Sequence, residues 1–199
     1  MAREHENGAR PPVRVRTVDI DTGAVPVFLT MLDSAVAWLT AAGRPGQWGT
    51  EPWSTRPGGE ARVESVIRRG HARLAEIDGV PAGGCVFSDT PSAYIDPIDE
   101  PELFINLLVT DRRFVGAGVG AALITDARRE AASRGVDLIR VDCYGGDDGA
   151  LVRQYQSLGF TPVTPFTVER PDQPEWPGQL LAMRLKSGWS ATPAGNTAS

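Results

Sequence analysis

The residues best suited to chemistry in this 199-residue chain are three alternating glycines in the run RRFVGAGVGAAL, at 112–123. Gly116, Gly118 and Gly120 follow the apolar stretch ELFINLLVT (102–110) and precede a long amphipathic segment. Glycine lets a backbone approach a ligand without interference from a Cβ atom. The first amides of a helix lack internal partners, and the helix dipole is positive at that end. The run therefore predicts a site for a phosphate or pyrophosphate, and hence a phosphate-bearing cofactor.

Two other interpretations of the glycine run stay open at this point. Gly116, Gly118 and Ala121 satisfy the dinucleotide pattern G-x-G-x-x-A, and Asp142 follows at roughly the distance of a ribose-binding acid. That pattern needs its first glycine directly after a strand, whereas TDRRF and Val115 intervene here. The second interpretation is that the glycines only ease the packing of a helix on a strand.

Patterning elsewhere predicts the elements that must position this run. Apolar alternation or continuous apolar runs predict strands at 13–19, 71–77, 80–90, 102–110, 138–144, 161–169 and 178–186, with an Asp78-Gly79 hairpin turn. Helical spacing predicts helices near 26–42, 60–70, 118–134 and 148–160. The order β-α-α-β-β-β-α-β-α-β-β contains one parallel crossover. The expected fold class is therefore α/β of the α+β type, with a mixed central sheet of about seven strands.

Composition and charge argue against several classes of protein. A net charge of −5 gives no reason to expect nucleic acid as a partner. Cys85 and Cys143 lie in apolar runs without metal-ligand spacing, so we expect reduced core cysteines and no metal.

The ends of the chain are polar. We expect a disordered lead-in at 1–12, one domain at 13–186 and a flexible tail at 187–199. The N-terminus lacks the apolar segment of a secretory signal, and no uncharged apolar stretch approaches membrane-spanning length. These features predict a cytoplasmic protein without a membrane partner.

The glycine run and a second motif together resemble the GCN5-related N-acetyltransferases (GNAT). In that family Arg or Gln, two residues, Gly, one residue, and Gly or Ala open a helix; the matching window here runs from Val115 to Gly120. The sequence YQSLGF (155–160) matches a family tyrosine placed four residues before a Gly-Phe pair. Val115 departs from the polar first residue, and Asp148 replaces the usual upstream Asn. The resemblance covers roughly 13–186 and implies the GNAT fold.

The same resemblance implies acetyl-CoA as cofactor and direct attack of a neutral amine on its thioester. Backbone amides of 115–121 would bind the pyrophosphate, Arg112 or Arg113 would replace the missing polar residue, and Tyr155 would protonate the leaving thiolate. The implied cofactor-binding residues are Leu107, Leu108 and Val109 for the pantetheine arm, together with Arg113, Val115, Gly116, Ala117, Gly118, Val119, Gly120, Ala121, Asp148 and Tyr155.

The group that deprotonates the acceptor does not follow from the match. Some family members carry a glutamate in the middle of the strand before the loop, and that position here is Phe104. Glu102 and Asn106 share its expected strand face. In one interpretation Glu102 takes the proton through a water held by Asn106. In the other, Glu102 is a solvated strand-end charge and Asn106 a buried amide with satisfied partners.

Two loops are candidates for the acceptor site. Loop 44–59 carries Trp48, Glu51 and Trp53, and aromatic rings beside a carboxylate suit a cationic ligand. Loop 89–102 carries Tyr94, Asp96 and further acidic residues without a basic one, which would attract an amine. Ordinary loop packing and solvated charge explain the same residues.

These observations predict an acetyl-CoA-dependent N-acetyltransferase acting on a primary amine, with a small cationic molecule as acceptor. Transfer to a protein or peptide, a non-catalytic acyl-CoA-binding module and an NAD(P)-binding oxidoreductase are the alternatives. The resemblance also suggests a homodimer.

Overall fold

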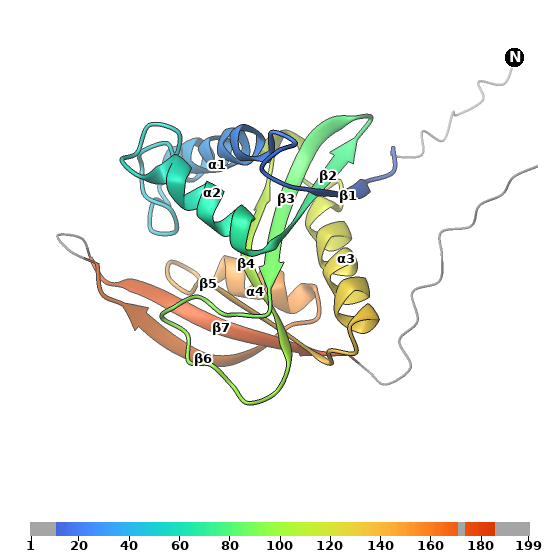
Figure 1. The fold of residues 1–199 in the computed structure, drawn as a ribbon. Helices are drawn as coiled ribbons and strands as arrows, with labels where there is room; N and C mark the ends of the chain where they lie inside the picture. Colours follow the sequence, from blue (N-terminus) through green and yellow to red (C-terminus); the bar gives the residue numbers. More distant parts are fainter. Residues whose placement is uncertain (1–10, 171–173, 186–199) are drawn as a thin grey trace, which may run out of the picture.

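The computed structural model describes residues 11–170 and 174–185. Within these ranges seven strands and four α-helices occur in the predicted order (Figure 1). They are β1 (Arg14–Val18), α1 (Ala24–Ala41), α2 (Gly59–Arg69), β2 (His71–Ile77), β3 (Val80–Ser88), β4 (Glu102–Thr110), η1 (Arg112–Phe114), α3 (Val119–Ser133), β5 (Leu138–Tyr144), α4 (Ala150–Ser157), β6 (Thr161–Val168) and β7 (Trp176–Arg184). The expected fold class is confirmed. The tail 187–199 and most of the lead-in 1–12 lie outside the described residues.

The seven strands form one mixed sheet in the order β1-β2-β3-β4-β5-β7-β6. Only β4 and β5 pair in parallel, through the crossover helix α3, and the other neighbours are antiparallel. The predicted hairpin between β2 and β3 is present: Asp78 and Gly79 have φ of 51° and 75°, as a two-residue turn of type I′ requires.

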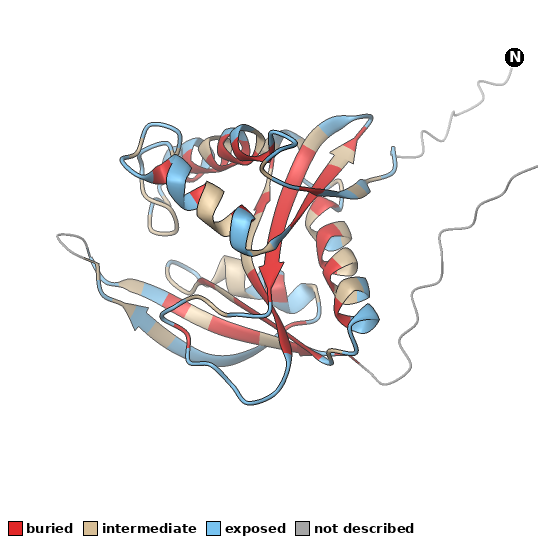
Figure 2. Ribbon diagram, in the orientation of Figure 1, coloured by how far each residue is buried: buried red, intermediate tan, exposed pale blue. Residues whose placement is uncertain are grey.

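Helices cover the sheet on both sides, and the buried residues concentrate where they pack (Figure 2). Side chains of α3 and α4 form one hydrophobic core, and those of α1 and α2 form a second core. A third, smaller cluster contains Ile95, Phe104 and Leu180, so the loop 89–101 covers the part of β4, β5 and β7 that the helices leave open.

Helix α1 is long and apolar, and its apolar side chains belong to the second core. By length and composition alone it could cross a membrane, and it is the one helix of the described residues that passes this test. Half of the apolar window is buried within the fold, because Phe28, Met31 and Leu32 pack into the second core.

Candidate active site

The centre of the candidate site is the point where β4 and β5 separate. Their parallel pairing runs from Glu102, opposite Leu138, to Ile105, opposite Val141, and ends there. From Asn106 onward, no described strand pairs with the edge of β4 that faces β5, although β4 continues to Thr110. This opens a strand edge whose amides and carbonyls can bind an extended ligand.

A β-bulge at Asn106 accounts for the separation. On the other side of β4, Val86 of β3 lies opposite Leu107 and Phe87 lies opposite Ile105, which leaves Asn106 as the extra residue. A bulge bends its strand and increases the local twist, so β4 turns away from β5 at this residue. The bulge also reverses the alternation of side chains: Ile105 faces the α3 core, whereas Leu107 packs with the α1 core.

Asn106 itself is held in place by the last residue of β3 and by loop 89–101. Its Oδ1 lies 2.9 Å from the Ser88 hydroxyl, which donates to it, and its Nδ2 donates to the Thr90 carbonyl at 3.2 Å. The side-chain amide is therefore satisfied within the protein. Asn106 thus has the partners that the structural interpretation expects, although it is half-buried rather than buried, and its role in holding a water stays a prediction.

The glycine run forms a loop that presents backbone amides at the start of α3. Gly116 and Gly118 have φ of 77° and 80°, which L side chains rarely adopt, and Gly118 is the N-cap of α3. The first hydrogen bond of the helical pattern runs from Ala122 N to Gly118 O. The amides of 119–121 come before it and have no acceptor within the helix. A Cβ added at Gly118 or Gly120 would meet no atom within 4 Å, so the protein leaves open space beside these two residues.

These observations fit a CoA-type ligand. The amides at the start of α3 and its positive dipole suit a diphosphate, and Leu107, Leu108 and Val109 lie on the open edge of β4 where an amide-containing arm could pair. Arg113 is anchored by Asp111, whose buried carboxylate accepts from its guanidinium at 2.8 Å, and the Arg113 side chain is 67% exposed beside the loop.

Val115 and Asp148 occupy the two positions that depart from the family pattern. Val115 is exposed, so it removes a polar side chain without closing the loop. Asp148 accepts from Ala150 N at 2.9 Å at the start of α4 and pairs with Arg44 at 3.0 Å. Asp148 therefore ties α4 to the loop after α1, and its contact with a cofactor stays a prediction.

Tyr155 of α4 is buried in the core behind the split strands. It is 6% exposed, and its ring meets Phe160 edge-on at 5.6 Å. Burial raises its pKa well above 10, and the neighbouring Cys143, Cys85 and Asp142 raise it further. The phenol is consequently protonated across the physiological pH range, as a general acid must be. The structure thus gives Tyr155 the packing role and leaves the acid role as a prediction.

The geometry of Glu102 does not support its expected role as the base. Its carboxylate is buried and paired with Arg140 of β5, Nε to Oε2 at 2.5 Å and Nη2 to Oε1 at 2.7 Å. Both carboxylate oxygens are thus occupied by the Arg140 guanidinium, which leaves neither of them directed at an acceptor amine. Glu102 is also not the solvated charge of the alternative interpretation, because the strand pairing brings Arg140 to it. We therefore assign the ion pair of Glu102 and Arg140 a structural role, which is to hold β4 and β5 in register.

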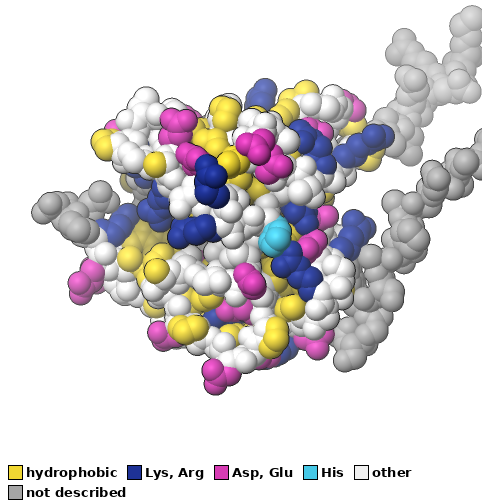
Figure 3. Space-filling model, viewed as in Figure 1, with side chains coloured by type: hydrophobic (Ala, Val, Ile, Leu, Met, Phe, Trp, Pro, Cys, Tyr) yellow, Lys and Arg dark blue, Asp and Glu magenta, His cyan; other side chains and the backbone are white. Residues whose placement is uncertain are grey.

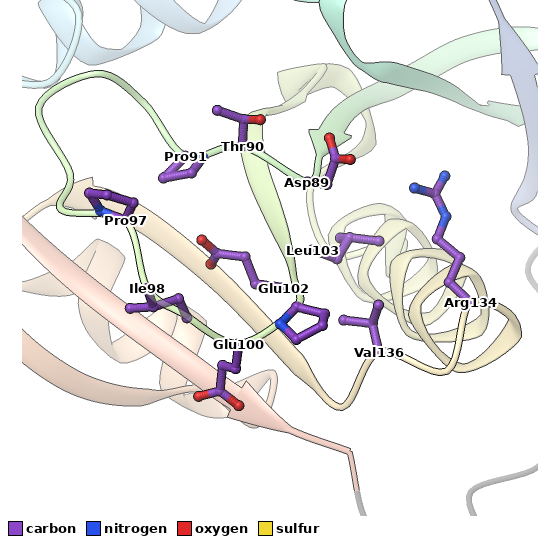
Figure 4. Close-up of a pocket in the computed structure, with 11 residues that line it drawn as sticks. Asp89, Thr90, Pro91, Pro97, Ile98, Glu100, Glu102, Leu103, Arg134 and Val136 are labelled. Carbon is purple, nitrogen blue, oxygen red and sulfur yellow. The ribbon is translucent and has the colours of Figure 1, made fainter.

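A pocket of about 520 Å³ lies next to Glu102, under loop 89–101 (Figure 4). Asp89, Thr90 and Arg134 contribute to its wall, whereas the predicted acceptor residues Tyr94 and Asp96 do not line it. The pocket lies at the start of β4, where β4 and β5 are still paired. It is thus removed from the split where a thioester would lie.

The aromatic residues of loop 44–59 are mostly engaged by the protein. Trp48 and Trp53 pack against the α1 core, and the guanidinium groups of Arg56 and Arg62 lie 4.7 Å and 5.6 Å from the Trp53 ring. Arg56 also donates to the carbonyls of Trp48 and Glu51, at 2.6 Å and 2.7 Å. Arginines thus already occupy the cation–π position at Trp53, and a substrate role for Trp48, Glu51 and Trp53 stays a prediction.

An acidic residue that the sequence suggested only as a possible ribose-binding acid lies on the other side of the split. Asp142 is the first residue of β5 beyond the last pair with β4, and the Tyr94 hydroxyl donates to its Oδ2 at 3.1 Å. Burial raises the pKa of Asp142 from 3.8 to about 6, and the Tyr94 hydrogen bond and the charge of Arg62 act in the opposite direction. The only signal in the sequence was an acid inside an apolar strand, LIRVDCY.

The face of the molecule in Figure 3 carries both charges: basic side chains gather near its middle, and acidic ones lie in its upper part and along its lower rim. The predicted acidic rim is partly neutralised, because Glu100 pairs with Arg184 at 2.6 Å. Asp96 is exposed.

The raised pKa of Asp142 has a consequence for stability. We expect Asp142→Asn to raise the free energy of unfolding at pH 7 by up to about 3 kcal/mol, because about 1.4 kcal/mol accompanies each unit between 3.8 and about 6. The folded-state pKa lies above the unfolded one, so the parent chain loses stability as the pH rises through this interval, whereas the amide does not. Urea unfolding at pH 4 and pH 7 measures the difference. A gain of equal size at both values would contradict the assigned burial cost.

The split between the central parallel strands, the glycine loop at the next helix and the buried tyrosine behind agree with the resemblance to acetyltransferases in the sequence. Comparison with family models matches residues 34–160 to the acetyltransferase (GNAT) family. The match spans more than half of the chain, and the chain belongs to this family. The predictions of family, fold class and acyltransferase activity are confirmed at this level.

Solved structures show the same fold at low sequence identity. The ribosomal-protein-alanine N-acetyltransferase from Brucella melitensis is 16% identical, with a TM-score of 0.62 over 86% of this chain and 99% of that one. The ribosomal-protein-S18-alanine N-acetyltransferase from Escherichia coli is 16% identical, with a TM-score of 0.61 over 94% and 99%. The structure of yncA from Salmonella typhimurium with its cofactor acetyl-CoA is 17% identical, with a TM-score of 0.59 over 92% and 99%. Comparison with curated proteins gave no match.

Proposed function

We propose that this chain binds acetyl-CoA and transfers its acetyl group to a primary amine of a small cationic molecule. The observation that carries the proposal is the open edge of β4 beyond Ile105, which leads to the glycine loop at the start of α3. One ligand can use both features only if it joins a diphosphate to an extended, amide-containing arm. The family as a whole uses acetyl-CoA, and the yncA structure holds it.

Each part of the site has a task in this proposal. When bound, acetyl-CoA supplies the acetyl group as a thioester. The amides of 119–121 hold the diphosphate, Arg113 adds a positive charge beside it, and Leu107 to Val109 orient the arm along β4. Tyr155 gives its proton to the leaving sulfur. Homodimer formation stays a prediction from the resemblance, and a cytoplasmic location stays a prediction from the sequence.

A matched pair of glycine variants tests cofactor binding. Gly118→Ala is expected to weaken acetyl-CoA binding at least about tenfold, because the added Cβ occupies open space beside the loop and strains the left-handed N-cap. Gly135, just beyond the other end of α3, has a similar φ of 68° and equally open surroundings. Gly135→Ala therefore controls for backbone strain. Isothermal calorimetry with acetyl-CoA should show the loss in Gly118→Ala alone, and equal losses in both variants would remove the loop from the binding site.

Two further measurements separate the alternatives. Calorimetry with NAD in place of acetyl-CoA tests the dinucleotide interpretation, for which NAD would bind and acetyl-CoA would not. Release of free thiol from acetyl-CoA with a panel of primary amines, including a peptide with an N-terminal alanine, tests transfer. Acetyl-CoA binding without thiol release for any amine would favour the non-catalytic module, and release with the peptide alone would favour peptide acetylation.

A further inference from the structure

We propose that Asp142, positioned by Tyr94, is the general base that removes the proton from the acceptor ammonium. This inference rests on the proposed function, since it names the residue that prepares the amine for transfer. It replaces the expected base Glu102, which is buried against Arg140. It also gives Tyr94 a specific role, which is to position Asp142. The sequence predicted Tyr94 only as a residue of a candidate acceptor loop.

The position of Asp142 is set by the split. Val141 makes the last pair with β4, and Asp142 follows it directly, so no β4 residue covers its edge of β5. On its other side Asp142 is paired with Leu180 of β7, which fixes the backbone. The carboxylate therefore sits on a rigid strand, at the level where β4 bends away at Asn106 and where the acetyl group would lie.

Strand alternation places the proposed acid and base on opposite faces of β5. Cys143 belongs to the core that contains Tyr155, whereas Arg140, two residues before Asp142, lies over Phe104 on the other face. Asp142 shares the face of Arg140, and the Tyr94 hydroxyl reaches it there at 3.1 Å. An acceptor would thus approach from the side of loop 89–101, while the proton for the sulfur comes from the α4 side.

The groups around Asp142 set the pKa of its carboxyl for this task. Tyr94 donates to it from loop 89–101, Arg62 of α2 exerts an attractive charge, and Tyr155 of α4 and Cys143 lie on the far side of the strand. Burial has the largest effect and raises the pKa to about 6, so the carboxyl is ionised at pH 7 yet more basic than an exposed one. Tyr94 uses one lone pair of the carboxylate, which has several.

The proton and electron balance is complete. The Asp142 carboxylate accepts one proton from the ammonium, and the nitrogen lone pair so freed forms the C–N bond to the acetyl carbon. The C–S bond breaks, its electron pair goes to sulfur, and Tyr155 supplies the proton that makes the thiol. Tyr155 is reprotonated from solvent, and Asp142 loses its proton to solvent.

Asp142→Asn tests the base directly in the full chain. For an acceptor from the panel that is an ammonium ion at pH 7, kcat/KM is expected to fall about 10²- to 10⁴-fold. For methoxyamine, which is neutral at that pH, the loss should be much smaller because no proton needs removal. The loss for the ammonium acceptor should also shrink as the pH approaches the pKa of that amine. Equal losses for both acceptors at every pH would overturn the proposal, as would unchanged activity.

Asp137→Asn is the matched control. Asp137 immediately precedes β5 and is exposed, so its amide removes the same charge from the far end of the strand. Its activity should equal that of the parent chain. Acetyl-CoA binding, measured by calorimetry, should be the same in the parent, Asp137→Asn and Asp142→Asn. Absence of binding in all three would refute the proposed function, whereas intact binding with intact transfer in Asp142→Asn would refute the base alone.

Tyr94→Phe provides a second test that does not depend on the acceptor. The Tyr94 hydrogen bond lowers the pKa of Asp142, so its loss should move that pKa upward from about 6. A carbon-13 NMR titration of the Asp142 carboxyl measures both values. In kinetics the acidic limb of kcat/KM should shift to higher pH by the same amount, with the plateau retained. A parent titration midpoint near the ordinary aspartate value, or an acidic limb that does not follow the NMR midpoint, would overturn the assignment.

Discussion

Replacing Arg140 with methionine is expected to lower the free energy of unfolding by about 3–5 kcal/mol. The side chains of Arg140 and Glu102 are 7% and 4% exposed, so the variant leaves a carboxylate without a counter-charge in the interior. Arg140 Nη2 also donates to the Asp96 carbonyl at 3.2 Å, and that bond to loop 89–101 is lost as well. Urea unfolding at pH 7 measures the loss.

Arg184→Met supplies the control. Arg184 and Glu100 form a similar bidentate pair at 2.6 Å near the same end of the sheet, but their side chains are 61% and 45% exposed. An exposed pair contributes at most about 1 kcal/mol, so this variant should change little. The double variant Glu102→Met with Arg140→Met should recover most of the loss, since an apolar pair can replace a buried ion pair. Equal effects of Arg140→Met and Arg184→Met would show that the buried pair does not hold β4 and β5 in register.

The parts of the molecule that sequence predicts best are those with local signals. Asp78 and Gly79 form the predicted turn because two adjacent residues with positive φ suffice to define it. The glycine loop before α3 is similar, since glycine spacing, the preceding strand and the following helix all lie within about twenty residues. The element order followed from the same kind of periodicity, and the family resemblance then indicated how the strands are arranged.

Pairings between distant residues were not accessible in this way. Glu102 meets Arg140 across 38 positions, and Tyr94 meets Asp142 across 48. Both contacts exist only because β4 and β5 are parallel neighbours and loop 89–101 folds over them. The β-bulge at Asn106 is a further case, because it depends on the register with β3 and not on a residue with a special backbone preference. The choice between Glu102 and Asp142 as base turns on these contacts alone.

The bulge also links the structural pair to the chemical one. Up to Ile105 the two strands are paired, and there Glu102 and Arg140 neutralise one another inside the fold. One residue further along each strand the pairing stops, and Asn106 and Asp142 have side chains that contact loop 89–101. The buried ion pair lies where β4 and β5 are paired. Asp142, whose burial costs stability, lies where the pairing has ended. This division is expected of a site on a rigid scaffold.

Tyr155→Phe is expected to lower kcat about 10²- to 10⁴-fold for acetyl-CoA, with little change in acetyl-CoA binding. Phenylalanine keeps the ring and its edge-on contact with Phe160, so the core and the melting temperature should be preserved. What is removed is the proton for the departing sulfur. Steady-state kinetics with acetyl-CoA and a saturating amine gives kcat, and calorimetry gives the affinity.

The acid role of Tyr155 has two signatures that packing alone would not produce. An acetyl donor whose leaving group needs no proton, such as 4-nitrophenyl acetate, should be used by Tyr155→Phe almost as well as by the parent chain. In addition, because the pKa of Tyr155 lies well above 10, the parent kcat should not fall between pH 7 and pH 10 through ionisation of this phenol. A loss of equal size for both donors would assign Tyr155 to the core only, and protonation of the sulfur would then fall to solvent entering along the open edge of β4.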